Sequence, residues 1–180
     1  MLASVLTFTR IHEPAALASQ VAEVYGSAFS IFRDGPTEQE VRAFAQQTLP
    51  AHAEREAFRF IAAFEDDVLL GFIYGFHGDR GEPWEEWIHA RVPVAVYDDW
   101  FVNQFDLTEF CVRAAHHGQG IGSQLYDALL TELAETPYER AVLTTRRIAN
   151  PARDFYLRRG WEVAWDALDD RFSLFGLWLR

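Results

Sequence analysis

Three glycines at alternate positions constrain this chain more than any other feature of its sequence: Gly118, Gly120 and Gly122. They follow an apolar run that predicts a strand, QFDLTEFCV (104–112), and open a stretch that predicts a helix, GIGSQLYDALLTELAE (120–135). Glycine lets other atoms approach the backbone closely, and a helix N-terminus presents unpaired N–H groups that bind phosphate oxygens. The sequence therefore predicts a phosphate cradle or, more simply, a tight strand-to-helix turn.

The spacing of these glycines excludes two other phosphate-binding loops. Gly-x-Gly-x-Gly is not the Gly-x-Gly-x-x-Gly of dinucleotide-binding domains, and no Gly-Lys-Ser/Thr follows, as it does in a P-loop. A nucleotide-binding module is therefore disfavoured.

The rest of the chain mixes helical and strand patterns, which predicts a single α/β domain over residues 1–180. Strands are expected at 4–9, 104–112, 140–145, 161–168 and 172–180, with a hairpin formed by 57–65 and 68–77. Helices are expected at 14–29, 36–53, 120–135 and 151–159. The second should end at Leu49-Pro50, and the fourth has Asn150 as its N-cap and Gly160 as its stop. The third carries an apolar stripe of Ile121, Leu125, Leu129 and Leu133. Residues 78–101 are expected to form an irregular or short-helical insert over a site, whose Trp84, Trp87 and Trp100 either surround a cation or close a small core.

Composition narrows the class of protein and its partners. A hydrophobic share of 49% predicts a folded core, and no apolar run approaches the roughly 20 residues of a membrane span. The start of the chain, MLASVLTFTR, lacks the features of a signal peptide, and one cysteine permits no internal disulfide, so a cytoplasmic location is expected. A net charge of −11 disfavours nucleic acid, which is bound mainly through basic side chains, and favours a cationic ligand.

The stretch EFCVRAAHHGQGIGSQLYDALL (109–130) resembles the acetyl-CoA-binding motif of the GNAT superfamily of N-acetyltransferases, Arg/Gln-x-x-Gly-x-Gly/Ala. His117, Gly120 and Gly122 align with its three marked positions, and a histidine in place of Arg or Gln is a departure. NPARDFYLRRGW (150–161) resembles the second motif of the family, and the two motifs stand in the family's order. With the hairpin and the closing strands, the resemblance covers nearly the whole chain.

The resemblance implies one GNAT domain over residues 1–180. Its central sheet would be mixed and mostly antiparallel, with helices on both faces and two parallel strands that splay apart to bind acetyl-CoA, the cosubstrate. The backbone would hold the pantetheine arm at Phe110, Cys111 and Val112, and the pyrophosphate at His117, Gly118, Gln119, Gly120, Ile121, Gly122 and Ser123. Asn150 would contact the pantetheine, and Phe155 and Tyr156 would lie near the cofactor. The adenosine 3′-phosphate would be met by one of four arginines that otherwise are surface charges, namely Arg113, Arg146, Arg147 and Arg153.

Three side chains are candidates for the chemistry of acyl transfer. Tyr156 occupies the family's tyrosine position, whose hydroxyl protonates the leaving thiolate; the alternative is a core tyrosine. Asp106 falls where histone-type members carry their glutamate base, and Glu109 lies on the opposite face of a regular strand unless a bulge intervenes. Either carboxylate serves as the base, or both are structural.

The single cysteine and the histidine pair are expected to have structural roles, not catalytic or metal-binding ones. Cys111 could form an acyl-enzyme, but its place in an apolar strand predicts a buried and inert thiol. The adjacent His116 and His117 have no third ligand at zinc spacing, so no metal is expected.

Together these features predict an acetyl-CoA-dependent N-acetyltransferase that acts on a primary amine, most simply a small cationic one, by direct transfer in a ternary complex. The alternative is a catalytically inactive CoA-binding sensor or interaction module. The acceptor stays open among an antibiotic, a polyamine, an amino acid and a protein N-terminus. A homodimer is also expected, with the tail FSLFGLWLR (172–180) as an edge strand.

Overall fold

The computed structural model describes residues 5–179, so the start of the first expected strand and the last residue lie outside the described residues. Within this part the strands form one mixed, mostly antiparallel sheet in the order β1-β2-β3-β4-β5-β7-β6. The strands are β1 (Leu6–Arg10), β2 (Arg59–Glu65), β3 (Val68–His77), β4 (Gln104–Val112), β5 (Arg140–Arg146), β6 (Glu162–Trp165) and β7 (Phe172–Trp178). The parallel ladder of β4 and β5 joins Gln104 to Arg140, Phe105 to Ala141 and Asp106 to Val142.

The helices match most of the expected positions. They are α1 (Ala18–Phe29), α2 (Glu38–Ala43), α3 (Leu49–Ala53), α4 (Pro83–His89), α5 (Val94–Trp100), α6 (Ile121–Ala134) and α7 (Pro151–Arg158).

Contacts divide the chain into two compact units. The first unit runs up to Phe76 and includes Thr108–Glu132, and the second holds His77–Leu107 and the chain from Leu133 onward. A single domain over residues 1–180 stays a prediction.

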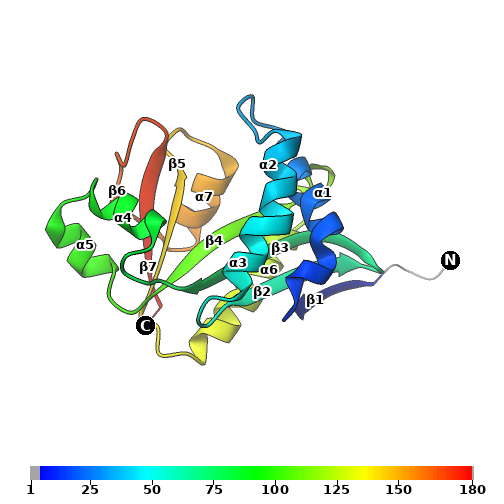
Figure 1. Ribbon diagram of the computed structural model, residues 1–180, viewed down its shortest axis with the longest axis horizontal. Coiled ribbons are helices and arrows are strands. Elements are labelled where there is room, and N and C mark those ends of the chain that lie inside the picture. Colours follow the sequence, from blue (N-terminus) through cyan, green and yellow to red (C-terminus); the bar gives the residue numbers. More distant parts are fainter. Residues whose placement is uncertain (1–4, 180) are drawn as a thin grey trace. The chain divides into compact units, whose positions relative to one another are not determined.

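In the first unit, helices cover both faces of the sheet (Figure 1). Alternate side chains of β2 and β3, such as Phe60, Phe72 and Tyr74, are buried in one core with residues of α1 and of the helical turns up to α3. On the other face α6 lies close, because a Cβ at Gly71 would be 3.1 Å from a methyl carbon of Leu125. The predicted α6 stripe is confirmed, since its members are all buried: Ile121, Leu125, Leu129 and Leu133.

The expectation that Leu49-Pro50 ends the second helix is wrong. The helical stretch continues to Ala53 because a π-helical turn, Phe44–Thr48, precedes the proline. Proline has no N–H, and its ring clashes with the carbonyl four residues earlier in a regular α-helix. Pro50 is tolerated because it stands in the first turn of a new segment, α3.

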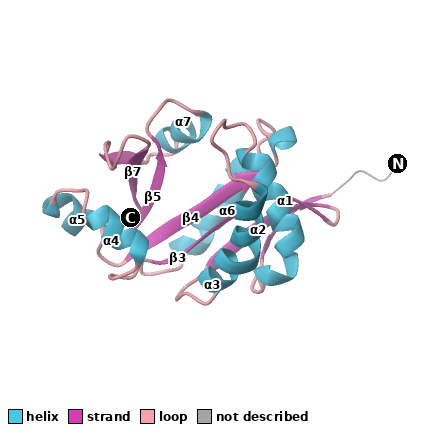
Figure 2. Cartoon of the chain, turned by 45° about the horizontal axis from the view of Figure 1, so that its top comes forward, coloured by secondary structure: helices cyan, strands magenta, loops and turns pink. Residues whose placement is uncertain are grey.

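In the second unit, β7 pairs antiparallel with both β5 and β6, and helices again lie on both faces (Figure 2). Val142 and Leu174 pack with residues of α4 and α5, whereas Phe175, on the opposite face of β7, meets Tyr156 of α7. The expectation that the tail forms an edge strand is therefore wrong: β7 has a hydrogen-bonded neighbour on each side, and β6 pairs only with β7 among the described strands.

The expected insert forms the helices α4 and α5. Trp100 is buried in the same core as Ile88 and Leu174, and Trp84 and Trp87 pack against this core. A Cβ at Gly176 would overlap the indole ring of Trp100, so this ring lies flat on the β7 backbone. These contacts favour the small-core alternative for the three tryptophans.

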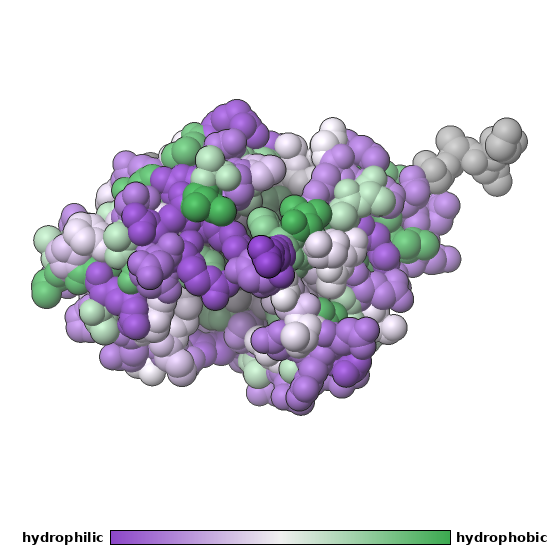
Figure 3. All heavy atoms as spheres, turned by 90° about the horizontal axis from the view of Figure 1, so that it is seen from above, coloured by the Kyte–Doolittle hydropathy of each residue, from purple (hydrophilic) through white to green (hydrophobic). Residues whose placement is uncertain are grey.

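Hydrophilic residues cover much of the face seen in Figure 3, and hydrophobic residues form small separate patches there. The large hydrophobic side chains with more than a third of their surface exposed are scattered along the chain: Val5, Leu6, Ile31, Val68, Val94, Val102, Ile148, Leu157, Val163 and Trp178. No helix of residues 5–179 is both long enough and apolar enough to cross a bilayer.

Candidate functional site

The glycine loop of the first unit connects the end of β4 to the start of α6. A short 3₁₀ turn, Ala114–His116, leads into Gly118 and Gly120, whose φ angles are +75° and +83°. Residues with a side chain rarely adopt this left-handed backbone conformation, which explains the two glycines. A Cβ at Gly118 would meet no atom within 4 Å, so the space beside it is open.

The N-terminus of α6 adds unpaired donors to this loop. The N–H of Gln124 donates to the carbonyl of Gly120 at 3.1 Å, at the start of the helical ladder. The N–H groups of Ile121, Gly122 and Ser123 precede that bond and have no partner within the helix. The 14-residue helix α6 thus presents unpaired N–H groups at its N-terminal end, next to positive-φ glycines and open space. This arrangement fits a pyrophosphate.

The third glycine, Gly122, allows α6 to pack closely against β4. A Cβ at Gly122 would lie 3.3 Å from the ring of Phe110, so α6 approaches β4 closely at this point. Gly122 thus belongs to a tight strand-to-helix turn, whereas Gly118 and Gly120 form an open loop, and the phosphate cradle stays a prediction.

His117, the departure from the family motif, fastens the loop to the strand. Its ring Nε2 donates to the carbonyl of Val112 at 2.8 Å, and its backbone N–H donates to the carbonyl of Ala114 at 3.2 Å. In this structure the N–H that was expected at the pyrophosphate is therefore engaged within the loop.

Glu109, on β4, has a partly buried carboxyl whose pKa is close to neutral pH. Burial raises the pKa of Glu109 to about 7, although hydrogen bonds from the N–H of Phe110 (3.2 Å) and the thiol of Cys111 (3.6 Å) act in the opposite direction. A carboxyl with a pKa near the working pH is suited to general base catalysis.

The surroundings of Glu109 come from helices and strands that the sequence does not link to it. The negative charge of Glu109 contributes, after burial, to raising the pKa of Tyr25 on α1 and of Tyr74 on β3. The hydroxyl of Tyr74 lies 3.0 Å from Nδ1 of His52 on α3. Alternation along β3 indicates that Tyr74 shares a face with Phe72, but not which strand or helix that face meets, so sequence reasoning missed these residues.

Cys111 is buried, as expected, with 1% of its surface exposed. Burial raises the pKa of its thiol, so the group stays protonated at neutral pH. This environment agrees with the prediction of an inert thiol.

Asp106 lies in the second unit, in a network of buried polar side chains. The side-chain amide of Gln104 donates to Asp106 at 3.3 Å and also to Glu85, and the hydroxyl of Tyr97 donates to Glu85 at 3.1 Å. Burial raises the pKa of Glu85. A Cβ at Gly78 would lie 2.7 Å from a carboxylate oxygen of Asp106, so the backbone also closes around this group.

The strand that carries both carboxylates is irregular. At one end of the β3–β4 pair the N–H of Gly78 donates to Gln104, and at the other the N–H of Arg113 donates to Leu70. Between these two bonds β4 has nine residue steps and β3 has eight, so β4 contains one extra residue, as in a β-bulge. Regular alternation therefore does not hold over the whole stretch from Gln104 to Arg113.

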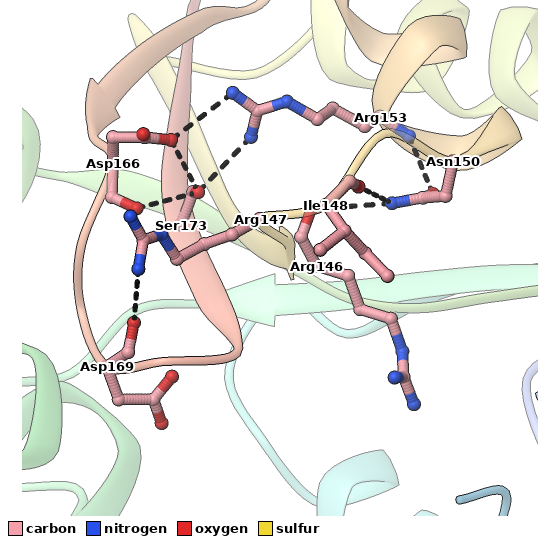
Figure 4. Close-up of polar contacts among 8 residues, drawn as sticks. All are labelled: Arg146, Arg147, Ile148, Asn150, Arg153, Asp166, Asp169 and Ser173. Carbon is pink, nitrogen blue, oxygen red and sulfur yellow. Dashed lines mark hydrogen bonds and ion pairs between the residues drawn. The ribbon is translucent and has the colours of Figure 1, made fainter. Parts of the chain in front are cut away.

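Asn150, in the second unit, is the N-cap of α7, as predicted (Figure 4). Its Oδ1 accepts from the N–H groups of Ala152 and Arg153, at 3.0 and 3.1 Å, and its Nδ2 donates to the carbonyl of Ile148 at 2.8 Å. The side-chain amide is thus bound to the backbone on both ends, and its contact with pantetheine stays a prediction.

Arg113 and Arg153, among the candidate arginines, have acidic partners. Arg153 donates to Asp166 and Ser173 in the second unit (Figure 4), and Arg113 pairs with Glu23 at 2.9 Å in the first. The hydrogen bond from Ser173, followed by the charge of Arg153, lowers the pKa of Asp166. These pairs fit the alternative reading of the arginines as structural charges.

Tyr156 is buried on α7 in a cluster of rings. Its ring lies 5.6 Å from that of Trp161 and 5.7 Å from that of Phe155, both edge to face. Phe155 is only partly buried, and the guanidinium of Arg159 lies 5.0 Å from its ring centre. The roles of Tyr156 and Phe155 stay predictions.

The family model described as the acetyltransferase (GNAT) family matches residues 20–161, which is most of the chain. No curated protein matches this chain significantly. Among the described residues, no three His, Cys, Asp or Glu side chains are grouped as metal ligands.

Solved structures share the fold at low identity. A putative acetyltransferase of the GNAT family from Desulfovibrio desulfuricans is 20% identical, with a TM-score of 0.69 over 98% of this chain and 100% of that one. The PaiA N-acetyltransferase of Thermoplasma acidophilum in complex with coenzyme A is 14% identical, with a TM-score of 0.66 over 96% and 99%. The ribosomal-protein-S18-alanine N-acetyltransferase of Escherichia coli is 12% identical, with a TM-score of 0.64 over 97% and 94%.

Proposed function

The chain belongs to the acetyltransferase (GNAT) family, and from this premise we propose that it transfers the acetyl group of acetyl-CoA to a primary amine, with Glu109 as the general base. One observation carries the proposal. A partly buried carboxyl with a pKa of about 7 lies on β4, three residues before the strand ends and the open glycine loop begins.

Each part of the loop region has a role in this reaction. The N–H groups from Gly118 to Ser123 bind the pyrophosphate, and the backbone of Phe110–Val112 holds the pantetheine arm. Bound acetyl-CoA supplies an activated acetyl thioester. Glu109 takes a proton from the acceptor amine, which must be neutral to attack. Tyr156 gives a proton to the leaving thiolate, so the acetyl group passes directly to the amine in a ternary complex.

Two observations support Glu109 over Asp106 as the base. Asp106 is tied into the network of Gln104 and Glu85, whereas Glu109 has the pKa that a base requires. We therefore assign Asp106 a structural role in the second unit.

The net charge of −11 supports a cationic acceptor, since an acidic protein attracts cations. Two of the structural relatives are N-acetyltransferases by name, which agrees with an amine acceptor. The alternative, a CoA-binding module without catalysis, would not explain why the pKa of Glu109 is raised to about 7.

The test is the pH dependence of kcat/KM, measured by release of the CoA thiol with the best acceptor of a panel of primary amines. The wild-type profile should contain an ascending limb with a midpoint near pH 7. Glu109→Gln should remove that limb and lower kcat by about 10²–10⁴-fold. Asp106→Asn should keep the limb.

An unchanged limb in Glu109→Gln would overturn the assignment of the base. Binding of acetyl-CoA without turnover of any amine in the panel would favour the inactive binding module instead.

A further inference from the structure

Both hydrogen bonds to the carboxylate of Glu109 use the same oxygen. Oε1 accepts from the N–H of Phe110 at 3.2 Å and from Sγ of Cys111 at 3.6 Å. Sulfur bonds are long, so 3.6 Å is within their range. Both contacts are made by Oε1, which leaves Oε2 to take a proton.

Cys111 is well placed to be a permanent donor. It follows Glu109 by two positions on β4, and its sulfur lies 3.6 Å from Oε1 of Glu109, so the two side chains meet on one side of the strand. Burial raises the pKa of the thiol and keeps its proton on sulfur at neutral pH. A thiol that never ionises contributes a donor without adding a second charge beside the base.

We propose that Cys111 is a positioning residue for Glu109, whose thiol donates to Oε1, favours the ionised carboxylate and leaves Oε2 to take the proton of the acceptor. The effect on the carboxyl belongs to the folded protein alone. Its consequence for turnover rests on the proposed function, in which Glu109 is the base.

Other titratable groups face this pair from neighbouring helices and strands. Tyr25 lies on α1, with Glu40 of α2 acting on it, and Tyr74 lies on β3, bonded to His52 of α3. The raised pKa values of the tyrosines keep both neutral in the pH range of the test. Histidine normally titrates near neutral pH, so a His52→Gln background separates its titration from that of Glu109.

The experiment measures the titration of Glu109 directly, by NMR of the protein with ¹³C-labelled glutamate carboxyls, assigned by loss of one resonance in Glu109→Gln. Cys111→Ala removes the donor, and Cys111→Ser keeps one in the same place. Val24→Ala is the control for a cavity, because Val24 is fully buried in the same core and has no bond to Glu109. The pH profile of kcat/KM is recorded for the same proteins.

Cys111→Ala should raise the midpoint of Glu109 by about half a pH unit or more. Cys111→Ser and Val24→Ala should leave it within a few tenths of a unit of the wild type or, for serine, below it. Equal midpoints in all the proteins, or an equal rise in Val24→Ala, would overturn the inference. A rise seen by NMR but absent from the kinetic profile would uphold the role of Cys111 and overturn Glu109 as the base.

Discussion

At the scale of single residues, Glu109 couples the proposed chemistry to stability. Its pKa is about 7 in the folded protein, against an ordinary value of 4.5. Folding therefore favours the protonated carboxyl. Its contribution to stability is complete below about pH 4.5 and is lost as the pH rises through about 7.

Glu109→Gln should remove this loss, because glutamine has no proton to release. Between pH 5.5 and pH 8, the free energy of unfolding of the wild type should fall relative to that of the variant by about 2 kcal/mol. Urea unfolding at the two pH values measures the difference. A constant difference between the two proteins would show that Glu109 titrates normally in the fold.

The residue types of the candidate site could be predicted from sequence, but their surroundings could not. The motif resemblance placed Asp106 at the family's base position, and Glu109 was the other candidate on the same strand before the glycine loop. What separates them is tertiary: burial beside Tyr25 and Tyr74 for Glu109, and the bond of the neighbouring Gln104 to Glu85 for Asp106. Gln104 is two positions before Asp106 on β4, but Glu85, Tyr25 and Tyr74 stand at no fixed distance along the chain from either carboxylate.

At the scale of helices and strands, sequence patterns located most of the structure. The strand at 104–112 was expected at the bounds that β4 has, and the cap of α7 follows from Asn150 and Pro151. Two features depended on local geometry that composition does not reveal. These are the π-helical turn before Pro50 and the extra residue in β4.

The cap of α7 is a target for mutation. Asn150→Ala should lower the free energy of unfolding by about 1 kcal/mol, because it leaves the N–H groups of Ala152 and Arg153 without their acceptor. Asn150→Asp keeps an acceptor and should retain most of that stability. Urea unfolding of the two variants checks the difference, and equal losses would show that the cap bonds contribute little.

At the scale of the whole molecule, charge should influence which amines are used. With a net charge of −11, long-range attraction favours a diamine over a monoamine of the same length. Raising the salt from about 20 to 200 mM shortens the range of this attraction. The kcat/KM of the diamine should therefore fall by more than that of the monoamine. Identical salt dependence for the two acceptors would remove the role of net charge.

The most direct measurement of the central claim is a calorimetric titration with acetyl-CoA of three proteins: wild type, Gly120→Glu and Gly81→Glu. Gly81 is a matched control, since it also has a positive φ, at +93°, and open space for a Cβ, but lies outside the glycine loop. Wild type and Gly81→Glu should bind with a roughly micromolar dissociation constant, and Gly120→Glu should not bind while staying folded. Equal binding by all three proteins, or no binding by the folded wild type, would contradict the assignment of the loop to acetyl-CoA.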